Sequence, residues 1–211
     1  MIKAVIFDFD GTLVDNMGIH YESFVKALKG MVKIKPMDIF MLEGGNIFSI
    51  TAELLSGLNL DEYEIKRIIQ KKRAIYEKMS KNLQMRPDAA RLIRKLKRLN
   101  YRIGLATGSP KEVVLSTFSQ RKVRLFDHIT TSDETKKPKP DPEPYLKCAE
   151  GLGVNPEECV AIDNAPLGIE SAKSAGMISI GLLSTVPREY LKRADFVIEN
   201  LREAEDIIKK L

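Results

Sequence analysis

The stretch AVIFDFDGTLVD, residues 4–15, joins a short apolar run to two closely spaced acids. The run 4–7 is β-branched and aromatic, which predicts a strand buried on both faces. Asp8 and Asp10 then lie where this strand leaves the core. Because like charges so close together repel, the pair favours a bound cation or a shared proton. The alternative is an ordinary solvated turn, in which Gly11 supplies a permissive backbone.

Length and composition indicate a globular protein. The chain has 211 residues, of which 44% are hydrophobic and 30% charged, enough for one core or for one core with a small second domain. No apolar run approaches the roughly 18 residues of a membrane span, and the N-terminus lacks a signal-peptide pattern. Cys148 and Cys159 have no metal-ligand spacing. We therefore expect a cytoplasmic protein with reduced, buried cysteines and no membrane partner.

The net charge of +5 admits two interpretations, nucleic-acid binding or an anionic small substrate. The lysines are scattered along helical segments such as 65–81, where charge opposite an apolar face is usually a solvated surface. No aromatic platforms are interleaved with the basic residues, as nucleic-acid binding would favour. We therefore expect no nucleic-acid partner, and a positive balance that suits an anion such as a phosphate ester.

Strands and helices alternate along the chain after one long helical stretch. Apolar patterns predict strands at 4–7, 102–107, 127–131, 159–163, 177–183 and 195–198. Helices are predicted at 86–100, 110–118, 143–154 and 166–176, and from about 201 to the end. The stretch 15–85 contains helical patterns at 46–58 and 61–80 and no strand. The alternation implies a parallel sheet covered by helices on both faces, with ligands at the carboxyl ends of the strands.

Polar residues follow several of these predicted strands. Thr107, Gly108 and Ser109 follow the second strand, and Asp163 and Asn164 follow the fourth. The third strand leads into TSDETKKPKPDPEP, residues 131–144. Each loop offers groups that suit a phosphate or a metal ion, so four matched loops are far stronger evidence than one acidic pair.

This set of loops resembles the haloacid dehalogenase superfamily, in its phosphatase and phosphomutase branch. The D-x-D-G-T motif matches residues 8–12, the Thr of the second motif matches Thr107, and IDNAPLGIESAKSAGM matches the fourth motif. The resemblance implies a three-layer, Rossmann-like α/β core with an inserted all-helical cap domain. It places the core at 1–14 and 86–211 and the cap at 15–85.

The resemblance also implies a catalytic pair and a metal. Asp8 would be the nucleophile that forms an aspartyl-phosphate, and Asp10 the general acid and base. Mg²⁺ would bind oxygens of Asp8, the Asp10 backbone and Asp163. The Thr107 hydroxyl and the amides of the next two residues would hold the phosphoryl oxygens, helped by the following helix. Those two residues are Gly108 and Ser109.

A lysine should hold the nucleophile and the phosphate together, and the sequence offers two registers for it. Lys137 and Lys139 both precede a proline. In the family an aromatic residue follows the lysine by six places, and Tyr145 satisfies this spacing only for Lys139. We therefore choose Lys139 as the catalytic and substrate-binding lysine, and expect Lys137, like Lys136, to be solvated loop charge.

The chain departs from the family pattern at the fourth motif, where Ile162 replaces the first of two adjacent acids found in many relatives. Asn164 is then expected to form hydrogen bonds around the metal rather than to bind it. Two cap features stay open. Gly44 and its neighbour could let backbone approach the substrate or form an ordinary turn. His20 could touch substrate or Asp10, or only pack in the cap, so we leave it out of the catalytic set.

The predicted function is a Mg²⁺-dependent phosphatase that hydrolyses a small phosphorylated metabolite, such as a sugar phosphate or phosphoglycolate, as a monomer. An acid at the second position of the first motif, Asp10, argues for phosphoryl chemistry over dehalogenation. The cap segment MLEGGNIFSITAE, residues 41–53, lacks the arginine that mutase-like caps carry. A β-phosphoglucomutase-like activity is therefore the alternative, followed by a non-catalytic regulatory scaffold.

Overall fold

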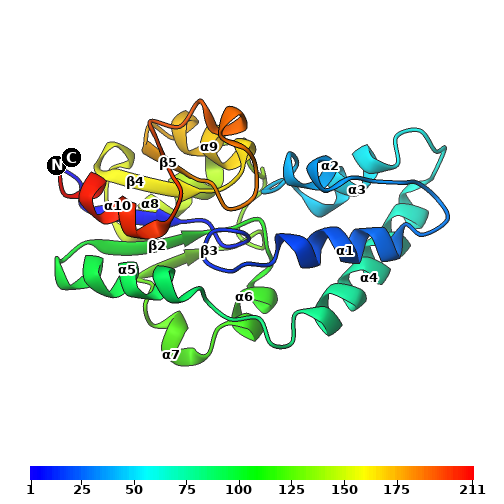
Figure 1. Cartoon of the computed structure of the whole chain (residues 1–211), viewed down its shortest axis with the longest axis horizontal. Helices are drawn as coiled ribbons and strands as arrows, with labels where there is room; N and C mark the ends of the chain where they lie inside the picture. The colour runs from blue at the N-terminus through cyan, green and yellow to red at the C-terminus, as the bar shows by residue number, and fades with distance from the viewer.

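The computed structural model describes residues 1–211 and contains one parallel sheet of six strands (Figure 1). The strand order is β3-β2-β1-β4-β5-β6. The strands are β1 (Ala4–Phe7), β2 (Arg102–Ala106), β3 (His128–Thr130), β4 (Cys159–Asp163), β5 (Ile178–Leu182) and β6 (Phe196–Ile198). Each strand predicted from the sequence is present, with ends that differ by at most one residue. β1 is central, and Phe7 aligns with Leu105 on one side and Ile162 on the other.

Helices cover both faces of the sheet, as the alternating pattern predicted. They are α5 (Pro87–Arg98), α6 (Lys111–Thr117), α7 (Gln120–Val123), α8 (Glu143–Leu152), α9 (Pro166–Ser174) and α10 (Leu201–Ile208), with 3₁₀ turns η1 (Pro156–Glu158) and η2 (Arg188–Leu191). α5 and α10 pack on one face, and α8 and α9 on the other. The short α7, η1 and η2 were not predicted, because three or four residues give no measurable periodicity.

The main hydrophobic core lies between the sheet and the face covered by α5 and α10. It joins 25 buried residues, including Phe7, Leu96 and Leu105. The smaller core under α8 and α9 joins 12 and contains both cysteines, which are buried and unpaired. These two cores together bury β1 from both sides, which explains its unbroken apolar run.

Four helices lie beyond the end of the sheet, between β1 and α5 (Figure 1). They are α1 (Met17–Ala27), α2 (Pro36–Phe40), α3 (Ile47–Leu54) and α4 (Glu62–Met79). Apolar residues of these helices form a separate cluster that includes Phe24, Ile39 and Ile68. Asp61 and Glu64 form a capping box at the start of α4. Helix α3 ends at Leu54, before the expected residue 58.

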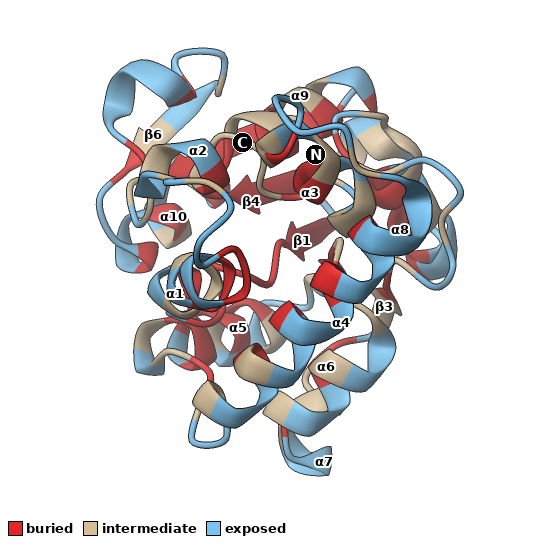
Figure 2. Cartoon of the chain, turned by 90° about the vertical axis from the view of Figure 1, so that its right-hand side faces the viewer, coloured by how far each residue is buried: buried red, intermediate tan, exposed pale blue.

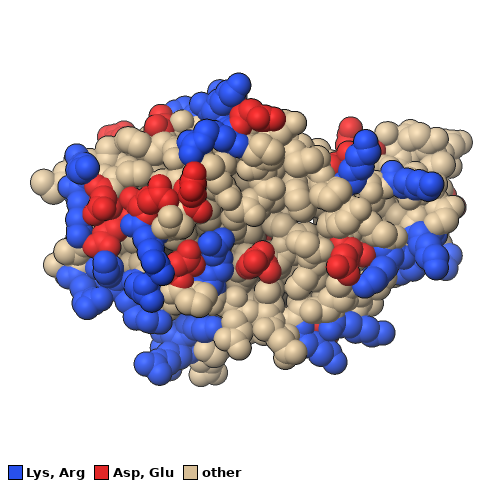
Figure 3. Space-filling view, viewed as in Figure 1, with Lys and Arg blue, Asp and Glu red and all other residues tan.

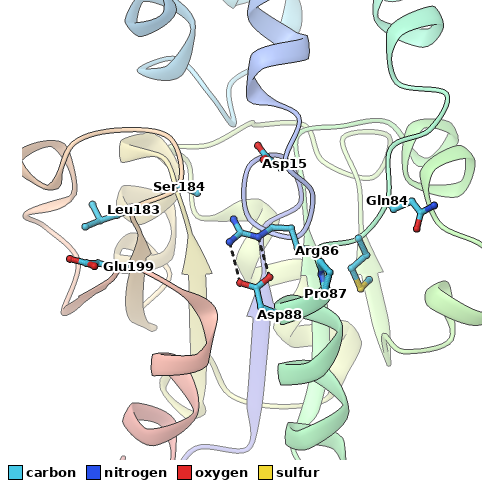
Figure 4. Close-up of a pocket in the computed structure, with 9 residues that line it drawn as sticks. Asp15, Gln84, Arg86, Pro87, Asp88, Leu183, Ser184 and Glu199 are labelled. Carbon is cyan, nitrogen blue, oxygen red and sulfur yellow. Dashed lines mark hydrogen bonds and ion pairs between the residues drawn. The ribbon is translucent and has the colours of Figure 1, made fainter.

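Two connecting segments join these helices to the sheet, and they lie side by side. Val14 bridges Met85, and the Arg86 amide donates to the Leu13 carbonyl at 2.8 Å. An open hollow of about 640 Å³ lies beside them (Figure 4). Its lining includes Asp15, Gln84, Arg86, Asp88, Ser184 and Glu199, and none of the predicted site residues. Arg86 is paired there with Asp88, at 3.1 and 3.2 Å.

The surface carries mixed charge. On the face shown in Figure 3, lysine and arginine side chains alternate with acids and do not gather into one basic patch. Such dispersed charge agrees with the solvated helix faces expected from the sequence. None of the helices has the length and apolar character needed to cross a lipid bilayer.

Candidate active site

The predicted site residues come together at the carboxyl edge of the sheet, facing the four helices between β1 and α5. Seen from that side, the ends of β1 and β4 lie at the centre of the molecule, ringed by α1, α3 and α4 (Figure 2). Asp8, Asp10, Thr107, Lys139 and Asp163 are all buried there. The sheet therefore brings together residues from four separate loops, as expected for the strand ends of a parallel sheet.

Lys139 bridges the acids that end β4 and follow β1. Its Nζ lies 2.7 Å from Asp8 Oδ1 and 2.8 Å from Asp163 Oδ2, and its side chain is 1% exposed. The Tyr145 hydroxyl donates to the same Asp163 oxygen at 2.7 Å. Lys137, by contrast, is 73% exposed and reaches only Asp141, at 3.6 Å. Of the two possible registers, the structure thus places Lys139 and not Lys137 in the site.

Asp10 has a different set of partners. Ser109 Oγ donates to Asp10 Oδ2 at 2.7 Å, and Asn16 Nδ2 donates to Oδ1 at 2.5 Å. His20 Nε2 lies 3.1 Å from the same Oδ1. The two acids of the first motif therefore occupy distinct environments, Asp8 beside Lys139 and Asp10 beside Ser109, Asn16 and His20.

Asn16, Lys72 and Tyr76 near Asp10 were not expected at the site from the sequence, and His20 was left open. His20 Nδ1 lies 3.0 Å from Lys72 Nζ, and Asn16 Nδ2 donates to the Tyr76 hydroxyl at 2.7 Å. Lys72 was grouped with the solvated lysines of 65–81, yet it is buried against the rings of Phe24 and Tyr76. The sequence signal for His20 was its position one turn into the first helix after Asp10, where its side chain can reach that acid.

The two carboxyl groups of the first motif also differ in acidity. Burial raises the pKa of Asp8 to about 8; the charge of Lys139 opposes this rise, and the charges of Asp163 and Asp10 add to it. Burial would also raise the pKa of Asp10, but hydrogen bonds from His20, Ser109 and Asn16 bring it below its ordinary value. The ion pairs with Asp163 and Asp8 raise the pKa of Lys139 despite its burial, so Lys139 stays charged.

The loop after β2 is arranged around Thr107. The Thr107 amide donates to the Thr130 carbonyl at 3.0 Å, which ties the loop to the end of β3. The Ser109 amide donates to Thr107 Oγ1 at 2.9 Å. This differs from the expected role of the Ser109 amide in holding phosphate, because the side chain of Thr107 already accepts its proton. The Ser109 hydroxyl instead contacts Asp10.

The donor set suits a hard cation with a partial water shell. Asp8 and Asp163 offer two converging carboxylates, whereas the Asp10 side chain turns towards His20. Accordingly, no cluster of three or more acid, histidine or cysteine side chains surrounds a common point. Mg²⁺ commonly uses one or two carboxylates and keeps several waters. Asp8 and Asp163 converge closely enough to share one ammonium group, at 2.7 and 2.8 Å from Lys139 Nζ, so the residues present fit this ion.

A glycine makes room for one of these carboxylates. A Cβ added at Gly168, in α9, would lie 1.9 Å from Asp163 Oδ2. The Ala165 amide donates to Asp163 Oδ1 at 2.9 Å, which fixes the carboxylate against the start of the helix. Asn164, next along the chain, contacts Thr12 and Thr185 and so links two loops around the site.

The turn at Gly44 approaches the site closely. Gly44 has a φ of +88°, and a Cβ there would lie 2.8 Å from Lys139 Cδ. A Cβ at Gly108 would lie 3.1 Å from the Gly44 carbonyl oxygen. The backbone of this turn thus lies against Lys139 and Gly108, and its approach to a substrate stays a prediction. Asn46 then begins α3, with its side chain accepting from the Phe48 amide at 2.7 Å.

Comparison with known proteins agrees with this architecture. Residues 5–182 match the family described as haloacid dehalogenase-like hydrolase. The β-phosphoglucomutase of Bacillus subtilis is 31% identical, over 100% of this chain and 93% of its own length. The phosphorylated carbohydrates phosphatase of Thermotoga maritima is 29% identical, over 83% and 82%. The crystal structure of β-phosphoglucomutase from Clostridium difficile has a TM-score of 0.87 at 29% identity, covering 100% of this chain and 97% of that one.

These likenesses define the class of protein. The chain belongs to the haloacid dehalogenase-like hydrolases, in the branch that contains phosphatases and β-phosphoglucomutase. It is an enzyme of the phosphomonoester hydrolase type.

Proposed function

We propose that the enzyme is a Mg²⁺-dependent phosphatase that hydrolyses a small phosphate monoester through an aspartyl-phosphate on Asp8. One relationship carries this proposal: Lys139 holds Asp8, while a separate group of side chains holds Asp10. Hydrolysis of a phosphate ester in two steps needs both a nucleophile and a proton donor that later accepts a proton. Two buried acids, two residues apart and with different partners, supply these two roles.

In the first step, an oxygen of Asp8 attacks phosphorus and the bond to the leaving alcohol breaks. Because the pKa of free Asp10 is low, it takes up a proton as the anionic substrate binds beside it. Asp10 gives this proton to that alcohol, and then takes a proton from the water that attacks the aspartyl-phosphate. The second attack releases inorganic phosphate and restores Asp8. His20, Asn16 and Ser109 hold the Asp10 carboxyl in place through both steps. Thr107 and the Gly108 amide contact the phosphoryl oxygens, and Lys139 balances their charge.

Asp8, Asp163 and the Asp10 carbonyl would hold Mg²⁺. When bound, the ion supplies charge neutralisation for the nucleophile and the phosphoryl group. Removal of divalent ions with a chelator should therefore abolish hydrolysis, and added Mg²⁺ should restore it.

We further propose that residues 15–85 form a cap domain that closes over the sheet edge. A separate hydrophobic cluster in α1–α4 and only two connecting strands, which meet at Val14 and Met85, support this division. Closure would exclude bulk water while leaving room for the attacking water. Solution scattering with and without a phosphate analogue would detect such a movement. The free cysteines suit a reducing compartment such as the cytoplasm, and a monomer provides every site residue.

Phosphomutase activity is the second candidate, favoured by the likeness to β-phosphoglucomutases in sequence and structure. One assay separates the candidates: hexose 1-phosphate is supplied with Mg²⁺, and both inorganic phosphate and hexose 6-phosphate are followed. A phosphatase releases phosphate, whereas a mutase returns it to sugar. Dominant hexose 6-phosphate would replace our proposal with the mutase. Absence of either product from a panel of monoesters would favour a non-catalytic scaffold.

The nucleophile is tested by Asp8→Asn, which should abolish turnover, because an amide is not a competent nucleophile. Full activity of this variant would overturn the mechanism.

A further inference from the structure

The segment that follows β5, residues 183–187, lies outside the four matched loops, yet it holds the first of them. The Ser184 hydroxyl donates to the Gly11 carbonyl at 2.7 Å, and Gly11 has a φ of +81° in the turn directly after Asp10. The Gly11 amide donates to Asn16 Oδ1 at 3.0 Å. The turn of the first motif is therefore fixed at Gly11 by two side chains, one before α1 and one from this segment.

Thr185, the next residue of the segment, reaches the same turn through Asn164. With its nitrogen facing the site, the Asn164 amide donates to the Asp10 carbonyl at 2.9 Å and to Thr12 Oγ1 at 2.8 Å. Its oxygen then accepts from Thr185 Oγ1 at 2.8 Å. Both ends of the amide have partners in this orientation, so the Thr185 hydroxyl supports the arrangement in which Asn164 holds the first motif.

Val186, one residue further on, belongs to an apolar contact with α2. Val186 is 4% exposed and forms a small cluster with Ile169 and Leu191, which we call the α2 seat. Met37 and Phe40 of α2 pack against this cluster, although α2 lies in the stretch between β1 and α5 (Figure 1). Phe40 also packs against the separate cluster of α1–α4. One segment thus contacts the first motif, the fourth motif and the helical region.

Resting on the proposed phosphatase activity and cap closure, we propose that Ser184 and Thr185 are positioning residues whose hold on the first motif depends on the cap. When the cap closes, α2 covers the α2 seat and orders the segment that carries both hydroxyls. Ser184 then fixes the Gly11 turn directly, and Thr185 fixes it through Asn164. When the cap opens, the seat loses its apolar cover, and the segment, which has no helix or strand, loosens.

The size of the contact with α2 suits reversible closure. Met37 and Phe40 are the α2 side chains that take part, and both stay half-buried. Such a contact is much smaller than the hydrophobic clusters inside either part of the chain. It can therefore form and break while both parts stay folded.

The position of the cap is measured first, by double electron–electron resonance. Nitroxide labels are attached at Gln70→Cys in α4 and Arg98→Cys in α5, both exposed positions. The native cysteines, Cys148 and Cys159, are buried and stay unlabelled. Mg²⁺ with aluminium fluoride serves as the phosphoryl analogue, and it should shift wild-type molecules to a single closed label distance.

A charge in the α2 seat should then oppose closure. Met37→Asp should raise the ratio of open to closed molecules about tenfold or more, because its carboxylate would be buried against apolar side chains. Met31→Asp, at an exposed methionine of the loop after α1, is the matched control and should close like the wild type. If circular dichroism shows that Met37→Asp is unfolded, Met37→Ala carries the comparison.

The two hydroxyls are tested by kinetics. Ser184→Ala should lower kcat about three- to tenfold with little change in KM, because it removes one hydrogen bond that shapes the site. Ser184→Thr keeps the hydroxyl and should restore kcat. Thr185→Val should resemble Ser184→Ala. Ser116→Ala removes a hydroxyl that donates to the Val113 carbonyl on an exposed helix, so it serves as the matched control.

A double variant shows whether the seat and the hydroxyls act together. In the Met37→Asp background the segment is already loose, so Ser184→Ala should cost less than about twofold in kcat, whereas losses at independent sites multiply. Hydrogen exchange of the Gly11 amide, measured with the analogue bound, gives a readout that needs no turnover. Met37→Asp and Ser184→Ala should each speed this exchange about three- to tenfold, and Met31→Asp should not.

The outcomes separate this inference from the proposed function. Unchanged closure in Met37→Asp overturns the seat. Unchanged kcat in Ser184→Ala and Thr185→Val overturns their positioning role, and equal losses from Ser184→Ala in both backgrounds overturn its dependence on the cap. Each of these results leaves the phosphatase intact, as does a wild type whose labels do not move, which overturns the inference together with cap closure. A wild type that hydrolyses no monoester overturns the phosphatase, and label distances with hydrogen exchange still decide the inference.

Discussion

Lys139 and Asp8, 131 positions apart in the sequence, meet in a buried ion pair of 2.7 Å at the carboxyl edge of the sheet. The lysine reaches this point because Tyr145 and α8 pack beneath the sheet, and the loop before α8 passes over the ends of β1 and β4. Its second contact, with Asp163, joins the first and fourth motifs through one ammonium group. The turn at Gly44 then covers the stem of the same side chain.

The lysine register is tested by a pair of alanine substitutions. Lys139→Ala removes a buried charge-assisted contact worth roughly 1.5–3 kcal/mol, so kcat/KM should fall about ten- to a hundredfold. Lys137→Ala, in the exposed part of the same loop, should change activity little. Steady-state hydrolysis of one monoester by both variants is sufficient. If the Lys137 variant is inactive and the Lys139 variant is nearly normal, the catalytic lysine is Lys137 and our register is wrong by two residues.

The proton-transfer role of Asp10 predicts a loss in the chemical step. Asp10→Asn should lower kcat by about 10²-fold or more, the usual contribution of a general acid and base, with little change in substrate affinity. His20→Ala should lower kcat less, by about tenfold, because Asn16 and Ser109 still hold the carboxyl. Glu22→Gln, on the exposed face of α1, serves as the control. Unchanged kcat in the Asp10 variant would contradict the assignment.

The close approach of Gly44 predicts sensitivity to a single methyl group. Gly44→Ala places a Cβ 2.8 Å from Lys139 Cδ and strains a residue with φ of +88°. We expect kcat/KM to fall about tenfold or more, since displacement of Lys139 disturbs the nucleophile. Gly57→Ala, where a Cβ meets nothing within 4 Å, should behave like the wild type. Comparable activity of the two variants would show that the turn has no part in shaping the site.

The loop that carries Lys139 should lose stability in acid. Amide hydrogen bonds from Lys136 and Lys137 lower the pKa of Glu143 from 4.5 to about 2. A lowered pKa in the folded state stabilises the fold fully above the unfolded value, and this contribution is lost as the pH falls from about 4.5 to about 2. Glu143→Gln should therefore be less stable than the wild type at pH 7, and the difference should vanish near pH 2.

Chemical denaturation of the wild type and of Glu143→Gln between pH 7 and pH 2 measures this difference in stability. Glu150→Gln, at an exposed position of the same helix, is the control and should follow the wild type. A difference that persists at pH 2, or grows there, would contradict the proposed origin of the stabilisation.

The sequence alone was sufficient for the sheet and for the residues at its edge. Strands buried on both faces read as short apolar runs, such as residues 4–7, and polar residues of the candidate site follow β1 and β2 or end β4. Because parallel strands share one carboxyl edge, Asp8, Thr107 and Asp163 could be placed together without coordinates. The spacing that the family resemblance implies, an aromatic residue six places on, selected Lys139, and Tyr145 is buried beside it.

Only the tertiary structure decided which residues of the long helical stretch belong to the site. His20 and Lys72 lie in patterns that read equally well as solvated or packed helix surface. His20 reaches Asp10, and Lys72 reaches His20, because α1 and α4 pack together beside the sheet edge. Periodicity reports which face of a helix is apolar, but the partner of a polar side chain is set by distances between segments far apart in the chain.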